Sequence, residues 1–65
     1  MTLKDMHYIS LIAEEKSITK AAARLFVAQP ALSQCVQKVE RELGIPVFIR
    51  TASGVTLTAE GQRFL

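Results

Sequence analysis

The chain has little of the chemistry that small proteins use to hold metals or to cross-link themselves. Its 65 residues include one cysteine, one histidine and no tryptophan. A single thiol, that of Cys35, cannot close an internal disulfide, and with His7 as the lone imidazole there is no Cys/His set for zinc. The three glycines stand apart from one another, which excludes a glycine-rich phosphate loop. We therefore expect no metal and no cofactor.

Long apolar runs and a secretory signal are also missing. No stretch approaches the roughly 20 apolar residues that cross a bilayer, and residues 1–6 mix both signs of charge. The sequence thus predicts a cytoplasmic protein without membrane contact. The shortness of the chain disfavours an enzyme, because one small core rarely builds the walls of a catalytic cleft.

The charges that are present favour an anionic partner. Eight Lys and Arg residues against six Asp and Glu residues give a net charge of +2. Residues 17–38 hold three cations, Lys20, Arg24 and Lys38, and no carboxylate. A solvated helical face normally mixes both signs, so this window indicates a surface for a polyanion. Chance in so short a chain is the alternative.

Apolar spacing predicts a helix that begins near Leu3 and is followed by a shorter one. Thr2 and Asp5 have the spacing of a capping box for the first helix. Its expected buried stripe consists of Met6, Ile9 and Ala13, flanked by Tyr8 and Ile12. Ser17 suits the N-cap of the second helix, whose apolar residues are Ile18, Ala21, Ala22 and Leu25.

A third helix is predicted to start around Gln29, after a break at residues 26–28. Pro30 suits its first turn, and Gly44 followed by Pro46 suits its end. Its expected core face is Leu32, Val36, Val39 and Leu43. The opposite face carries Pro30, Ser33, Gln34, Gln37, Lys38 and Arg41. Packing is the expected role of Cys35, which lies beside the core face, and His7 is expected at the surface.

The second and third predicted helices form a helix-turn-helix over about residues 18–37. The second helix of such a pair enters the major groove of DNA by its N-terminal end, which here holds Gln29, Pro30, Ser33 and Gln34. Glutamine pairs with adenine, serine reaches a base or a phosphate, and lysine neutralises a phosphate. The alternative is a polar solvent face without a ligand.

The rest of the chain predicts a hairpin and one more helix. Residues 47–50 and 55–58 read as strands joined by a four-residue loop. Arg50 on the hairpin has the reach for a phosphate or a narrow minor groove, and an ion pair with Glu40 or Glu42 is its alternative role. Thr58 suits the N-cap of a helix over residues 59–65, which we expect to continue beyond them.

Taken together, these residues resemble the DNA-binding end of LysR-type transcriptional regulators. The resemblance runs through the whole chain in order, over residues 17–22, Leu25, and residues 29–33, 40–44, 48–50 and 57–61. It implies a mainly α, winged helix-turn-helix domain over residues 1–58 and the start of a linker helix at 59–65, through which protomers form a homodimer or a higher homo-oligomer. It also implies that a small-molecule effector acts only through a C-terminal domain outside this chain.

Carried over by position, the resemblance assigns the third helix to the major groove and Arg50 to the flanking backbone or minor groove of double-stranded DNA. The residues expected to bind DNA are Thr19, Gln29, Pro30, Ser33, Gln34, Gln37, Lys38 and Arg50. The departures are mild: Ala28 stands where a serine or threonine cap is frequent, and Ile18 and Tyr8 replace frequent phenylalanines. A protein-interaction module is the main alternative, because winged helices also dock on proteins.

Overall fold

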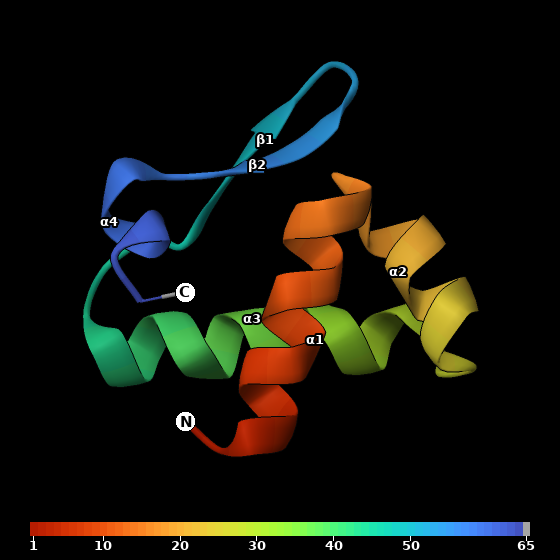
Figure 1. The fold of residues 1–65 in the computed structure, drawn as a ribbon, viewed down its shortest axis with the longest axis horizontal. Coiled ribbons are helices and arrows are strands. Elements are labelled where there is room, and N and C mark those ends of the chain that lie inside the picture. The colour runs from red at the N-terminus through yellow and green to blue at the C-terminus, as the bar shows by residue number, and fades with distance from the viewer. Residues whose placement is uncertain (65) are drawn as a thin grey trace.

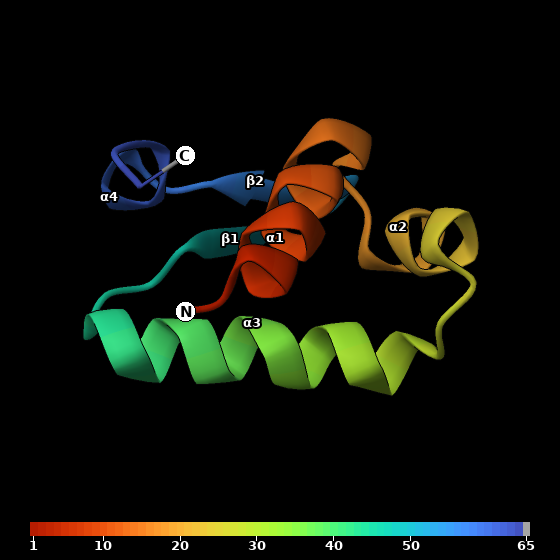
Figure 2. The same cartoon turned by 60° about the horizontal axis from the view of Figure 1, so that its bottom comes forward.

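The computed structural model describes residues 1–64 as three helices, a hairpin and a short final helix (Figure 1). The elements in chain order are α1 (Leu3–Glu15), α2 (Ile18–Leu25), α3 (Gln29–Leu43), β1 (Phe48–Thr51), β2 (Gly54–Leu57) and α4 (Ala59–Gln62). Seen from a second side, α3 forms a base, and the other elements lie on one side of it (Figure 2). The Cα atoms extend over 27 × 27 × 17 Å. The predicted mainly α, winged helix-turn-helix architecture is confirmed.

The helix ends follow the expected capping chemistry. The Asp5 amide donates to Thr2 Oγ1 and the Thr2 amide donates to Asp5 Oδ2, both at 3.0 Å, so the predicted capping box is present. Ser17 Oγ accepts the Lys20 amide at 3.1 Å. Gly44 ends α3 with φ +70°. Ala28, in contrast, offers α3 no side-chain cap, which leaves the first amides of that helix without a local side-chain acceptor.

The core lies where α1, α2, α3 and β2 meet. Its buried apolar residues are Ile9, Leu11, Ile12, Ile18, Ala21, Ala22, Leu32, Cys35, Val36, Val39, Val47 and Val55. The stripe predicted for α1 is partly wrong, since Met6 is 36% exposed and Ala13 only half-buried. Because α1 contacts α2 and β2 as well as α3, its buried face turns toward Leu11 and Ile12. The face predicted for α3 is confirmed except that Leu43 is half-buried.

The hairpin is tighter than the sequence predicts. Arg50 pairs with Val55 and Thr51 pairs with Gly54, so the connection is the two residues 52–53 and the expected four-residue loop is wrong. The strands are also displaced from the predicted bounds. Thr58 leaves β2 because its hydroxyl caps α4, accepting the Gly61 amide at 2.8 Å and donating to the Pro46 carbonyl at 2.6 Å.

The last helix is short within the described residues. It spans Ala59–Gln62, and the predicted helix over residues 59–65 ends at Leu65, outside the part that the structure describes. None of the helices within residues 1–64 combines the length and apolar character needed to cross a membrane.

An unusual residue occupies the turn between α2 and α3. Phe26 adopts the left-handed conformation, with φ +56°, and its side chain is 96% exposed. A residue with a side chain is strained by about 1 to 2 kcal/mol in this conformation. Because the Phe26 ring is exposed, no burial of apolar surface offsets that strain. We expect Phe26→Gly to raise the free energy of unfolding by about 0.5 to 1 kcal/mol, measured by urea denaturation. A loss of stability would show that the phenyl ring makes a contact that its exposure conceals.

Candidate nucleic-acid interface

The helix-turn-helix exposes the N-terminal end of α3. Phe26 closes α2 by donating its amide to the carbonyls of Ala22 and Ala23, and the chain turns into α3 over residues 26–28. Gln29, Pro30 and Gln34 are exposed on the first turns of α3. Pro30 has no N–H and the Ala31 amide donates to the Ala28 carbonyl at 3.0 Å, so what this end mainly presents is the positive end of the helix dipole, without a side-chain cap.

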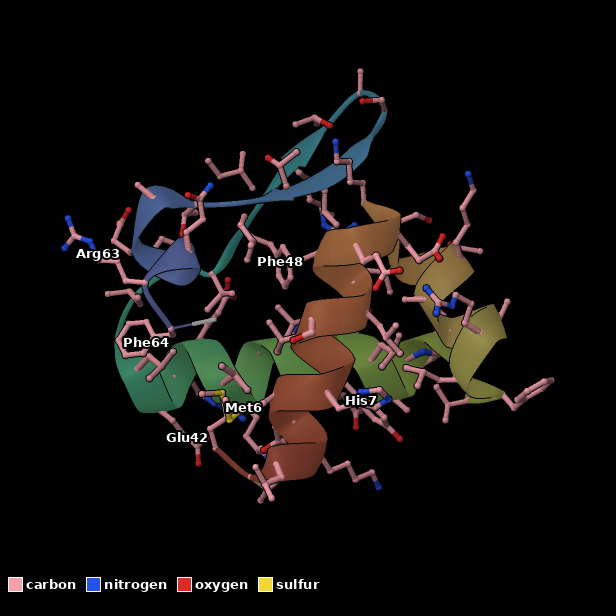
Figure 3. All side chains as sticks on the ribbon, viewed as in Figure 1. Met6, His7, Glu42, Phe48, Arg63 and Phe64 are labelled. Carbon is pink, nitrogen blue, oxygen red and sulfur yellow. The ribbon has the colours of Figure 1, made fainter. Side chains whose placement is uncertain are left out.

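One side of α3 faces the hairpin. Ser33 and Gln37 line a depression together with Arg50 of β1. The other lining residues are Ile18, Val36, Glu40, Phe48 and Val55. The ring of Phe48, at the root of β1, lies in the space between the hairpin and α3 (Figure 3). The fold therefore brings three of the predicted DNA-binding side chains, Ser33, Gln37 and Arg50, to one surface.

The other side of α3 faces the start of α1. Gln34 and Lys38 line a second depression there with Lys4, Tyr8 and Ala31 among its other residues. The Lys38 ammonium lies 2.7 Å from Asp5 Oδ2, and Asp5 is only 6% exposed. This ion pair joins α1 to α3. A contact of Lys38 with DNA phosphate stays a prediction, because the structure gives its ammonium a partner inside the domain.

The Asp5 carboxylate is the centre of a small buried polar cluster. Its hydrogen bonds from Lys38 and from the Thr2 amide hold the pKa of this carboxyl well below its ordinary value. The same hydrogen bond raises the pKa of Lys38. The Cys35 thiol donates to Asp5 Oδ1 at 3.6 Å, and burial, reinforced by the charge of Asp5, raises the pKa of that thiol to about 11. Cys35 is thus a packed, protonated thiol.

The two helices of the motif also touch through predicted site residues. Thr19, exposed on α2, donates its hydroxyl to the side-chain oxygen of Gln29 across a long contact of 3.4 Å. Thr19 and Gln29 are ten residues apart in the chain and adjacent on the surface. This contact leaves the Gln29 amino group without a side-chain partner within residues 1–64.

Two of the three cations in the carboxylate-free window are compensated in space. Arg24 donates to Glu15 at 2.8 Å and to Glu14 at 3.2 Å, both at the end of α1, and Lys38 is paired with Asp5. Lys20 is the cation of that window without an ion pair within residues 1–64. The positive surface inferred from the run of sequence is therefore smaller than its three charges suggested.

Arg50 does not form the alternative ion pair. The side chain of Glu40 instead accepts the backbone amides of Val47 at 2.7 Å and Phe48 at 3.3 Å, and that of Glu42 lies 3.1 Å from the N-terminal ammonium. Arg50 is exposed and has no ion pair in the described part of the chain.

Sequence reasoning missed the roles of Asp5 and Glu40. The sequence identifies Asp5 only as a capping residue and places Lys38 on the outer face of α3, so their ion pair emerges only when α1 packs against α3. His7 is exposed and Cys35 buried, as predicted. Within residues 1–64, no group of three His, Cys, Asp or Glu side chains is close enough to hold a metal ion.

Comparison with known proteins agrees with this geometry. Residues 3–62 match the family described as bacterial regulatory helix-turn-helix protein, lysR family. The full chain is 49% identical to the uncharacterized HTH-type transcriptional regulator YcgK of Bacillus subtilis (strain 168) and covers 20% of it. Over 64 residues it is 42% identical to the HTH-type transcriptional regulator BudR of Raoultella terrigena, covering 98% of the chain and 22% of that protein.

Solved structures show the same fold. The BenM DNA-binding domain in complex with catB site 1 DNA superimposes with a TM-score of 0.91 at 44% identity, over 98% of this chain and 69% of that one. The CbnR DNA-binding domain in its DNA complex gives a TM-score of 0.94 at 35% identity, over 100% of this chain and 75% of that one.

A helix-turn-helix core with a two-stranded wing is the fold of a winged helix-turn-helix protein. The family match over residues 3–62 shows that the chain belongs to the lysR family of bacterial regulatory helix-turn-helix proteins. It spans about a fifth of the length of the YcgK and BudR regulators named above.

Proposed function

We propose that this chain binds double-stranded DNA sequence-specifically, as the DNA-binding domain of a bacterial LysR-type transcriptional regulator. The α3 helix enters the major groove by its N-terminal end, and the wing formed by β1 and β2 lies on the flanking backbone or minor groove. One observation carries the proposal: α3 exposes its N-terminal end and brings Ser33 and Gln37 to one surface with Arg50, which has no ion pair within residues 1–64, in a fold that matches domains solved in complex with DNA.

The charged side chains of this surface supply affinity for DNA, and its neutral polar side chains supply selectivity for sequence. Lys20 and Arg50, which have no ion pair within residues 1–64, neutralise phosphates and supply affinity for any sequence. The amides and hydroxyls of Gln29, Ser33 and Gln34 contact base edges or fix the register on the backbone. Pro30, Gln37 and Thr19 complete the contact surface around them.

An NMR titration tests the proposal directly. The chain, labelled with ¹⁵N, is titrated with a short AT-rich duplex at two salt concentrations. Binding by α3 and the wing shifts the amides of residues 29–38 and 50–54, and higher salt weakens the effect because counterions are released on binding. Smaller shifts at Thr19 and Lys20 are also expected, since both lie in the proposed contact surface. Shifts confined to other parts of the chain, or none in a chain shown to be folded, contradict the proposal. A salt-indifferent interaction with protein would then favour the interaction module.

Gln34 offers a test of selectivity. We expect Gln34→Ala to weaken binding to the preferred site by about 1 to 3 kcal/mol, because a glutamine amide pairs with a base edge in the major groove, and to leave binding to random DNA nearly unchanged. Fluorescence anisotropy on both duplexes measures the difference. Gln62→Ala makes the same chemical change on α4 and is expected to alter neither affinity. Equal weakening on both duplexes from Gln34→Ala would assign it a backbone contact instead.

The wider setting follows from the same family membership. The relatives are transcriptional regulators several times longer than this chain, so we infer a cytoplasmic, non-enzymatic regulator that acts as a homodimer on two half-sites. Full-length CbnR has been solved in complex with its target DNA, which supports DNA binding as the role of this domain in a longer regulator. The small-molecule effector acts through a domain beyond this chain, and the helix that starts at Ala59 joins the protomers.

A further inference from the structure

Glu40 places a carboxylate in the surface that is proposed to face DNA. It is half-buried on α3 and lines the same depression as Ser33, Gln37 and Arg50. A negative charge here opposes a phosphate backbone. Its contacts show what it does instead: Oε2 accepts the Val47 amide at 2.7 Å and the Phe48 amide at 3.3 Å, so the carboxylate faces the chain that leads into β1.

The strand that carries Arg50 has few other attachments to the helices. Beyond its root, β1 is exposed from Ile49 to Thr51. It is β2, not β1, that packs on α1 and α4, and the Val55 amide of β2 donates to the Lys16 carbonyl at 3.0 Å. The bonds to Glu40 are thus the side-chain hydrogen bonds within residues 1–64 that tie the β1 root to α3.

The position of Glu40 on α3 connects this anchor to the DNA-facing residues. Ser33, Gln37 and Glu40 follow one another at spacings of four and three, so they lie along one stripe of the helix. Ser33 and Gln37 face the depression with groups that can donate and accept hydrogen bonds, and Glu40 accepts the amides at the start of β1. The side chain that attaches the start of β1 to α3 therefore lies on the same stripe as two of the predicted DNA-binding residues.

We propose that Glu40 is the positioning residue of the wing. By accepting the amides of Val47 and Phe48, it holds Arg50 at a fixed place beside Ser33 and Gln37, so that α3 and the wing engage one duplex together. The anchoring is a property of the folded chain, and its effect on DNA rests on the proposed function. Glu40 acts through reach and acceptance of hydrogen bonds, with its charge as a secondary property.

Two substitutions separate reach from charge. Glu40→Gln keeps the length of the side chain and a carbonyl oxygen that accepts an N–H, but removes the charge. Glu40→Asp keeps the charge and is shorter by one methylene. Glu40→Ala removes both. Glu42→Ala, on the same helix with its carboxylate on the N-terminal ammonium, is the matched control. Thermal unfolding first establishes which variants are folded at the temperature of the experiments.

The first measurement needs no DNA. Amide hydrogen exchange is followed at Val47 and Phe48, together with the ¹⁵N heteronuclear NOE of Arg50. We expect Glu40→Ala and Glu40→Asp to speed exchange at these two amides by about tenfold or more and to lower the Arg50 NOE, with α2 amides unchanged. Glu40→Gln and Glu42→Ala stay near the parent chain. Unchanged exchange in Glu40→Asp, which remains charged, would overturn the anchor.

The second measurement is a double-mutant cycle on duplex binding. We expect Glu40→Asp to weaken binding about three- to tenfold in the parent chain. In an Arg50→Ala background we expect less than about twofold, because the side chain that Glu40 positions is already absent. Glu40→Gln binds at least as tightly as the parent. Equal weakening in both backgrounds would overturn the link to Arg50. If the parent chain bound no DNA, the proposed function would fail, and the exchange data would still decide the anchor.

Discussion

Replacing Gly54 by alanine is expected to destabilise the domain by about 3 kcal/mol or more, because the added methyl group meets both backbone strain and a steric overlap. Gly54 has φ +143°, a backbone conformation that side-chain-bearing residues rarely adopt. A Cβ atom at this position would lie 2.1 Å from the Lys16 carbonyl oxygen, which is also the acceptor of the Val55 amide. The hairpin would have to leave α1 to relieve the overlap. Urea denaturation measures the loss.

Gly44 supplies the matched control for this prediction. It also has a positive φ, of +70°, but a Cβ there meets nothing within 4 Å. Gly44→Ala is therefore expected to cost only the backbone strain, about 1 kcal/mol. Similar losses for the two substitutions would mean that the hairpin moves away from Lys16 easily, and that the close approach contributes little to stability.

Asp5→Asn is expected to lower the free energy of unfolding by about 1 to 3 kcal/mol at neutral pH, although the side chain keeps its shape. Asp5 is buried and accepts the Thr2 amide, the Lys38 ammonium and the Cys35 thiol. An asparagine amide replaces one carboxylate oxygen by a donor, so one of these groups loses its acceptor and the ion pair disappears. Glu60→Gln, an exposed carboxylate on α4, is the control and should change little.

The same carboxylate makes stability depend on acidity. The pKa of Asp5 lies well below its ordinary value of 3.8 in the folded chain, with the hydrogen bond from Lys38 as the first cause. The unfolded chain thus binds this proton more readily, so the contribution of Asp5 is complete above about pH 5 and declines as pH falls below about 4. The free energy of unfolding, measured by urea denaturation between pH 2 and pH 6, should depend less steeply on pH in Asp5→Asn than in the parent. Parallel slopes would assign the acid sensitivity to other groups.

Local signals in the sequence predicted the helices well. The capping box at Thr2 and Asp5, the cap at Ser17, Pro30 in a first turn and Gly44 at a helix end each act within a few residues, and the structure has all of them. The α3 core face also followed from its period. The hairpin was less predictable, because its register depends on Gly54 fitting against Lys16, a contact between segments almost forty residues apart.

The candidate site was predictable as a set of residues and not as an electrostatic surface. The helix-turn-helix pattern places Gln29, Ser33 and Gln34 at the exposed end of α3, as expected. The sequence did not reveal which cations lack an ion pair, because Arg24 and Lys38 pair with carboxylates on a separate helix, α1. A run without acids says nothing about acids that tertiary packing brings beside it. For the same reason Glu40 gave no sign that it holds the wing.

The dimensions of the domain limit how much DNA one copy covers. Its Cα atoms extend over 27 Å in the longest direction, and each strand of the hairpin is four residues long. With 3.4 Å between successive base pairs, one copy lying along a duplex covers about eight to ten base pairs once side chains are included. A protected footprint longer than that on nuclease digestion reports more than one copy of the domain on the DNA.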